Sequence, residues 1–371
     1  MKPYRYVFII KTTYDCNLRC RYCYESDRQP SEKMNFSTLS SLISKIGKYA
    51  VRTQNAAEFI WHGGEPLLAG IDFYKKAVQL QKDVEGNFDY INSIQTNGIL
   101  LDNNFADFFN ENKFFVGISI DGPPTIHNSQ RIGQSKKDNY REVYSALVRM
   151  DERGNRPGAL AVFTRKTLEY IDEFYEYFRD RSLSVKLNPL IKDGRAKSKD
   201  GAHLHITPEE YGYGLIYLFN RWVKEPELTF TINPLYNYIR SIISSKVYEC
   251  NQSGSCFNYF KIFPNGNVSL CGFQPYKNNI LGNINNIDLE LIINSSIREN
   301  YIKIKSSIKN SCGSCEYFGI CNGGCTNSTY NRLGSLLKSD YWCESKKMIF
   351  KHIENHVNNT KIIILNQRGS E

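Results

Sequence analysis

Short apolar segments alternate with longer amphipathic ones along the first half of the chain. Apolar runs rich in β-branched residues predict buried strands over 6–13, 57–61, 90–95, 115–120, 158–164 and 184–190. Segments with apolar residues at helical spacing predict helices between them, over 36–49 (with Ser37 as N-cap), 71–83, 103–112, 139–154 and 167–181. Six such alternations predict an α/β fold, a partial (β/α)6 barrel of the TIM type with a parallel sheet.

The pattern changes after residue 190. Residues 191–207 are charged and contain glycine, which indicates a loop, and Thr207-Pro208 predicts the start of a helix that runs to Glu225. From Cys250 onward we expect short strands, a hairpin turn at 263–267 and few helices before Cys343. These features predict a barrel over 1–195, a linker and helix over 196–245, a cysteine-rich domain over 246–357 and a loose tail over 358–371.

Polar motifs follow three successive strands directly. They are HGGEP at 62–66, QTNG at 95–98 and SIDG at 119–122. The carboxyl ends of barrel strands share one face, and the chemistry of such barrels lies on the loops of that face. We therefore expect these motifs to form one site.

Eleven cysteines fall into four groups, and none lies between residues 24 and 249. The chain begins without a signal-peptide pattern and has no apolar run long enough to span a membrane, so we expect a cytoplasmic protein. Disulfides are disfavoured there, and metal or cluster ligation is the natural interpretation. The groups are Cys16, Cys20 and Cys23; Cys250, Cys256 and Cys271; Cys312, Cys315, Cys321 and Cys325; and Cys343.

The first group has the spacing C-x3-C-x2-C. Three thiolates can hold three irons of a 4Fe–4S cluster and leave the fourth iron open, although a zinc site is an alternative for this motif alone. With Tyr22 before its last cysteine, the motif resembles that of the radical S-adenosylmethionine (SAM) superfamily. The resemblance implies that the open iron chelates SAM, which is cleaved to a 5′-deoxyadenosyl radical.

The same resemblance implies the SAM contacts. Gly63, Gly64 and Glu65 resemble the motif that accepts hydrogen bonds from the SAM ammonium group. Ser119 is expected to bind the ribose or carboxylate, and Arg131 to pair with the carboxylate unless it is only a surface cation. Tyr22 completes the expected cofactor contacts. No general base is identified.

The eight later cysteines resemble the SPASM extension of radical SAM enzymes, with C-x9-G-x4-C, then C-x2-C-x5-C-x3-C, then a final cysteine. By this resemblance Cys250, Cys256, Cys271 and Cys325 hold one auxiliary 4Fe–4S cluster, and Cys312, Cys315, Cys321 and Cys343 hold a second. The last four-cysteine motif alone would also fit a zinc module. Fully ligated clusters are expected to transfer electrons. An alternative hypothesis is an iron–sulfur electron carrier without enzymatic activity, but such a protein would need none of the SAM motifs.

Nearly the whole chain resembles the anaerobic sulfatase-maturating enzymes, which oxidise a Cys or Ser side chain to formylglycine. In those enzymes an aspartate, thought to be the general base, follows the third SPASM cysteine. Gly272 stands there in this chain and cannot accept a proton. In addition, His62 stands where those enzymes usually have glutamine.

These departures favour a second activity of the superfamily, the maturation of a ribosomally made peptide. The compact size resembles XYE-type maturases, which install cyclophane crosslinks, so an oxidative crosslink (carbon–carbon or thioether) in a precursor peptide is the preferred hypothesis and sulfatase maturation the alternative. Expected partners are the precursor peptide and an electron donor such as flavodoxin or ferredoxin. The net charge of +9 is spread along the chain and permits an acidic peptide, while nucleic acid and membranes are not expected.

Overall fold

The strands of the protein form one continuous sheet. The computed structural model describes residues 5–25, 32–133, 138–271 and 279–360. Ten described strands lie in the order β10-β9-β8-β1-β2-β3-β4-β5-β6-β7, and only the pairs β8–β9 and β9–β10 are antiparallel. Their bounds are β1 Arg5–Lys11, β2 Ala56–His62, β3 Tyr90–Thr96, β4 Phe115–Ser119, β5 Gly158–Phe163, β6 Val185–Pro189, β7 Ile232–Asn233, β8 Tyr259–Ile262, β9 Asn267–Leu270 and β10 Gly282–Asn283.

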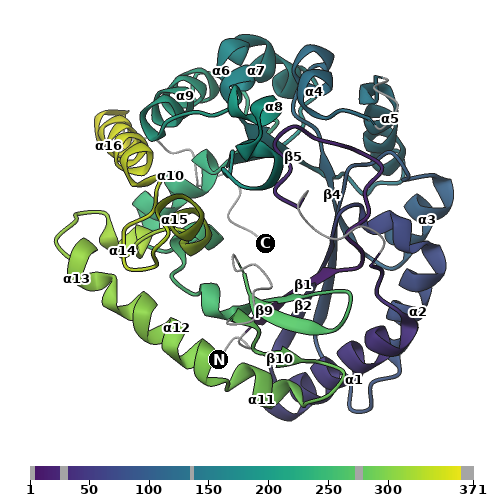
Figure 1. The fold of residues 1–371 in the computed structure, drawn as a ribbon. Helices are drawn as coiled ribbons and strands as arrows, with labels where there is room; N and C mark the ends of the chain where they lie inside the picture. Colours follow the sequence, from purple (N-terminus) through teal and green to yellow (C-terminus); the bar gives the residue numbers. More distant parts are fainter. Residues whose placement is uncertain (1–4, 26–31, 134–137, 272–278, 361–371) are drawn as a thin grey trace.

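Helices surround this sheet (Figure 1). Those of the barrel half are α1 Phe36–Thr53, α2 Ile71–Lys82, α3 Asn103–Glu111, α4 Pro124–Gln130, α5 Tyr140–Asp151, α6 Arg165–Glu169, α7 Ile171–Asp180, α8 Lys199–Ala202, α9 Pro208–Trp222 and α10 Leu235–Ser244. The later ones are α11 Leu289–Ile293, α12 Ser296–Ser307, α13 Lys309–Cys312, α14 Phe318–Cys321, α15 Thr326–Leu333 and α16 Cys343–Thr360. Short 3-10 turns lie at η1 Pro66–Ala69, η2 Gly194–Lys197, η3 Cys250–Gln252 and η4 Cys256–Asn258. No described helix is both long and apolar enough to cross a bilayer.

The predicted barrel of alternating strands and helices is confirmed, and every predicted strand is present with its ends shifted by at most two residues. Helix α1 is capped by Asn35, whose side chain accepts from the amide of Thr38, so the prediction of Ser37 as N-cap was wrong. The single helix expected over 167–181 divides at Tyr170 into α6 and α7. The expectation of few helices between Cys250 and Cys343 was also wrong, because α11 to α15 all lie there.

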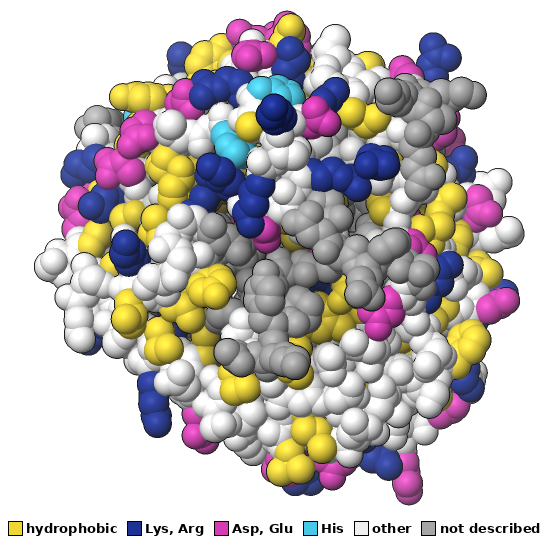
Figure 2. Space-filling model, viewed as in Figure 1, with side chains coloured by type: hydrophobic (Ala, Val, Ile, Leu, Met, Phe, Trp, Pro, Cys, Tyr) yellow, Lys and Arg dark blue, Asp and Glu magenta, His cyan; other side chains and the backbone are white. Residues whose placement is uncertain are grey.

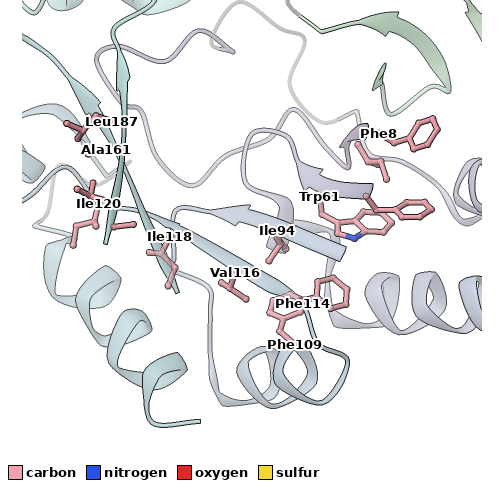
Figure 3. Close-up of a cluster of buried hydrophobic side chains, with 14 of the residues drawn as sticks. Phe8, Trp61, Ile94, Phe109, Phe114, Val116, Ile118, Ile120, Ala161 and Leu187 are labelled. Atoms are coloured by element: carbon pink, nitrogen blue, oxygen red, sulfur yellow. The ribbon is translucent and has the colours of Figure 1, made fainter. Parts of the chain in front are cut away.

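An apolar core between the sheet and the outer helices keeps the strands in place. Figure 3 shows Phe8, Trp61, Ile94 and Val116, from four neighbouring strands, pointing into this core. All four are at least 95% buried, and the Trp61 ring meets Tyr74 of α2 edge to face at 5.7 Å. Burial of this size holds the carboxyl ends of the strands in fixed relative positions.

The cysteine-rich half joins the barrel through the sheet itself. Strand β8 pairs in parallel with β1, with Val7 opposite Tyr259 and Ile10 opposite Ile262. The predicted hairpin at 263–267 then turns the chain into β9. Cys256 precedes β8, and Cys271 follows the antiparallel β9 and donates its amide to Tyr259 O at 2.8 Å. The second cysteine group therefore lies at the end of the sheet where β1 begins, whereas the first group follows the carboxyl end of β1.

Candidate functional site

The first cysteine group lies on the loop that follows β1. Backbone hydrogen bonds hold this loop: Arg19 N donates to Ile132 O at 2.7 Å and Arg21 N to Gln130 O at 2.8 Å. The segment around η2, expected to be a plain loop, closes over it, since Arg195 N donates to Cys23 O at 3.0 Å. The position of the loop is therefore fixed by main-chain contacts with two other parts of the barrel.

The thiols of Cys16, Cys20 and Cys23 interact with one another in this loop. Burial, together with smaller contributions from the neighbouring thiols, raises the pKa of Cys16 to about 11 and that of Cys20 to about 12. Thiolates gathered away from water need positive charge beside them, which bound iron supplies. The three residues therefore fit a shared iron–sulfur cluster. In the described part of the chain, no group of three or more His, Cys, Asp or Glu side chains is placed to hold a single metal ion.

Gly63 and Gly64 bring the end of β2 against the cysteine loop. Gly64 N donates to Thr13 O at 2.9 Å, and Glu65 N donates to Asp15 O at 2.8 Å. A Cβ atom on Gly64 would lie 2.2 Å from Asp15 O, and one on Gly63 would lie 2.4 Å from Thr13 O. Only glycine permits this approach, because any side chain would overlap the backbone of the cysteine loop. The glycine pair thus lets the end of β2 pack directly against that loop.

Glu65 is fully buried and holds two strand ends together. Its Oε1 accepts from Thr96 Oγ1 at 2.6 Å and from Leu67 N at 3.0 Å, and its Oε2 accepts from Asn97 N at 2.8 Å. Burial raises the pKa of Glu65 to about 7 although these three donors oppose the shift. Asn97 in turn donates to Cys16 Sγ at 3.7 Å. The carboxylate thus links β2, β3 and the first cysteine group.

Ser119 lies buried at the end of β4, where its Oγ accepts from Gln95 Nε2 at 3.0 Å. Ser119 therefore lies at the same end of the barrel as Glu65, as predicted from its position at the end of a strand.

Arg131 forms a buried ion pair with Asp121. Its Nε and Nη2 donate to the two carboxylate oxygens at 3.0 and 3.1 Å, and the Tyr22 hydroxyl donates to the same carboxylate. Burial lowers the pKa of Arg131, but Asp121, Tyr22 and Cys20 together raise it more, so the net shift is upward. The Arg131 charge also opposes the rise in the pKa of Cys20. Arg131 is thus no surface cation, and its guanidinium lies 5.4 Å from the centre of the Tyr22 ring in the cysteine loop.

A further polar network was missed by sequence reasoning. Lys11 Nζ, at the end of β1, donates to Glu25 Oε1 at 2.7 Å and lies 3.2 Å from Nδ1 of His62 at the end of β2. Gly63 N donates to the same Nδ1 at 2.7 Å. Burial and the Lys11 charge lower the pKa of His62 to about 3, so the ring is neutral. The sequence did carry one signal for this network. Lys11 ends an apolar strand, and a lysine buried in such a place needs a polar partner.

Seven of the eight later cysteines fall into two interacting sets. Electrostatic interactions join Cys250, Cys256, Cys271 and Cys325, and burial raises the pKa of Cys271 to about 12. The other set is Cys312, Cys321 and Cys343, with Cys315 one turn after Cys312 through a 3.0 Å backbone bond. Gly272, the position where the sequence lacks an acid, lies outside the described residues.

Models of known protein families match both halves of the chain. The model of the Radical SAM superfamily matches residues 10–178, and that of an iron–sulfur cluster-binding domain, SPASM, matches residues 250–316. The chain is 28% identical to a cysteine-type anaerobic sulfatase-maturating enzyme of Clostridium perfringens, over 93% of this chain and 96% of that protein. It is 29% identical to a serine-type enzyme of Bacteroides thetaiotaomicron, over 98% of this chain and 93% of that protein.

Solved structures give the same result. The structure of native anSMEcpe with bound AdoMet and Cp18Cys peptide superposes with a TM-score of 0.86 at 27% identity, covering 96% of this chain and 99% of that one. Streptococcus suis SuiB bound to S-adenosylmethionine shares the fold, with a TM-score of 0.65 at 13% identity over 92% of this chain and 77% of that one. The chain therefore belongs to the radical SAM superfamily and carries a SPASM domain, and the two domains imply a SAM-binding 4Fe–4S cluster together with auxiliary clusters.

Proposed function

We propose that this chain oxidises a side chain within a peptide by radical SAM chemistry. The carrying observation is its similarity over nearly the full length to an enzyme whose structure holds AdoMet and a peptide. When bound, the reduced cluster and SAM supply the radical that abstracts a hydrogen atom. The chain itself binds and orients the peptide and excludes water from the site. An external donor such as flavodoxin or ferredoxin supplies the electron.

The proposed ligands of the SAM-binding cluster are Cys16, Cys20 and Cys23. The proposal assigns one auxiliary cluster to Cys250, Cys256, Cys271 and Cys325 and the other to Cys312, Cys315, Cys321 and Cys343. The mutual interaction of the thiols within each set supports this division. Gly63, Gly64, Glu65, Ser119, Tyr22 and Arg131 are the proposed framework of the SAM site, where Glu65 and Arg131 act by holding strand ends and the cysteine loop.

The peptide has a basic surface to dock on. Arg21, Arg165, Lys166 and His203 line an open cavity of about 350 Å³ beside the first cysteine loop, together with one acid, Glu169, which pairs with Lys166 at 3.3 Å. Figure 2 shows Lys, Arg and His side chains gathered in the upper half of the face on which Figure 1 places α6 and α8. Opposite charge steers a partner toward such a surface and fixes its register. An acidic peptide segment fits there.

Two products fit this chemistry. The curated relatives support formylglycine, made from a cysteine or serine of a sulfatase. An oxidative crosslink in a precursor peptide is the second candidate, and two residues favour it. Formylglycine formation needs a proton acceptor for the substrate thiol or hydroxyl, and Gly272 has none. His62 is a second departure from the pattern of sulfatase-maturating enzymes, which usually have glutamine there. Its ring is neutral and lies 3.2 Å from Lys11 Nζ.

Anaerobic reconstitution with iron, sulfide, SAM and dithionite tests the proposal. We expect 5′-deoxyadenosine to form, and more of it when a substrate peptide is present. Mass spectrometry then separates the products: a crosslink removes two hydrogens from the peptide, whereas formylglycine replaces the cysteine thiol with an aldehyde. A reconstituted enzyme that makes no 5′-deoxyadenosine with any peptide would overturn the proposal.

A further inference from the structure

Lys346 and Asp340 form a buried ion pair in the cysteine-rich half of the chain. Lys346 Nζ lies 2.7 Å from Asp340 Oδ2, and the side chains are 6% and 2% exposed. Ser328 also donates to the carboxylate. Desolvating two charges is costly, and a hydrophobic pair of similar volume would often be as stable, so the position of such a pair calls for a reason other than stability.

Asp340 contacts both auxiliary sets of cysteines. Its Oδ2 accepts from the backbone amide of Cys325 at 3.0 Å. Its backbone carbonyl accepts from the amide of Cys343 at 2.9 Å. Cys325 belongs to the first auxiliary set and Cys343 to the second, so one residue holds a ligand of each.

Lys346 reaches both sets as well. Its Nζ donates to the carbonyl of Asn251, the residue after Cys250, at 3.1 Å. The lysine itself stands in the first turn of α16, which begins at Cys343. Burial raises the pKa of Cys321, and among the opposing charges that of Lys346 acts most strongly. The ammonium group thus lies between the two sets, with ligands of each close by.

We propose that the Asp340–Lys346 pair is a positioning pair that sets the reduction potentials of both auxiliary clusters. This inference rests on the assignment of the two sets as cluster ligands made above. A fixed positive charge beside a cluster favours the added electron and a fixed negative charge opposes it, and hydrogen bonds around the ligands tune the potential further. The pair exerts these two opposite effects where it contacts ligands, or neighbours of ligands, of both sets.

Potentiometric titration of the holoenzyme, followed by EPR, tests the inference. Asp340→Asn keeps an acceptor for the Cys325 amide but removes the negative charge, so the auxiliary potentials should rise. Lys346→Met removes the positive charge at similar length, so they should fall. A role in folding alone would not move the potentials in opposite directions. Arg52→Met, which breaks the exposed Arg52–Glu290 pair, is the control and should leave both potentials unchanged.

Iron and sulfide content is measured first. Wild-type protein that binds only enough iron for the SAM cluster would overturn the ligand assignment, and this inference with it. Fully loaded variants with wild-type potentials would overturn the inference itself. If Lys346→Met loses iron, the comparison of Asp340→Asn with Asp340→Glu decides, since only the first removes the charge. Equal potentials in those two variants would contradict the proposed role.

Discussion

Lys11 donates from Nζ to Glu25 Oε1 at 2.7 Å and so ties the end of β1 to the residue two places beyond Cys23. The side chains are 1% and 6% exposed, so neither charge is solvated. The same ammonium lies 3.2 Å from His62 at the end of β2. This contact closes the cysteine loop back onto the strand from which it starts.

Lys11→Met should therefore destabilise the protein strongly. Removing Lys11 takes away a positive charge 2.7 Å from the buried Glu25 carboxylate, and breaking a buried ion pair costs about 3–5 kcal/mol in comparable cases. Denaturant unfolding of the loaded enzyme measures the loss. Lys76→Met, at an exposed position of α2, is the control and should change stability by no more than about 0.5 kcal/mol. The double variant Lys11→Met/Glu25→Gln should recover part of the loss, and equal stability of Lys11→Met and Lys76→Met would contradict the prediction.

Gly64→Ala should displace the cysteine loop. Its new Cβ would lie 2.2 Å from Asp15 O, and backbone atoms cannot move aside as a flexible side chain can. Overpacking of this kind costs about 1–3 kcal/mol, and we expect it to lower the iron content of the first cluster as well. Gly158→Ala in β5 is the matched control, because nothing lies within 4 Å of the added atom. Iron analysis and denaturant unfolding of both variants check the difference between them.

The positions of the strands could be predicted because burial on both faces leaves a continuous apolar signature, as at 6–13 and 115–120. The position of helix α12 could not be predicted. Its apolar residues have weak helical spacing, and it is held by tertiary contacts: Arg298 donates to Phe257 O at 2.8 Å, and Tyr301 is buried. Packing against an element far away in sequence decided its structure, which local pattern does not record.

The candidate site shows the same division. The order of motifs placed Glu65 and Ser119 at one face of the barrel, because strand ends in a parallel sheet meet there. Their partners could not be foreseen. That Arg131 pairs with Asp121 through two hydrogen bonds depends on how the loop after β4 folds back over the sheet. Such pairings are set by three-dimensional proximity, and residue spacing does not determine them.

His127 should make stability depend on acid pH. The ring is buried in α4, where Nδ1 accepts from Asp121 N at 3.3 Å and Nε2 lies 2.8 Å from Asn139 Oδ1. Burial lowers its pKa from 6.5 to about 4, and Arg131 adds to the shift. Its contribution is therefore complete above about pH 6.5 and is lost as the pH falls toward 4, by about 3 kcal/mol in all.

Denaturant unfolding at several pH values tests this dependence, with His127→Gln as the comparison. The variant has no imidazole to protonate, so its stability should fall less than that of the wild type between about pH 6.5 and 4. Parallel losses in the two proteins would show that other groups cause the acid sensitivity.

Replacing Cys16, Cys20 and Cys23 together by alanine should separate radical generation from the auxiliary centres. Main-chain hydrogen bonds hold the loop, such as that from Arg21 N to Gln130 O at 2.8 Å, so the barrel should still fold. Iron content should fall by about a third, since one of three clusters is lost, and no 5′-deoxyadenosine should form with SAM and dithionite. Cys343→Ala should instead lose iron from the second auxiliary site and still cleave SAM. SAM cleavage by the triple variant would show that the first group does not hold the SAM cluster.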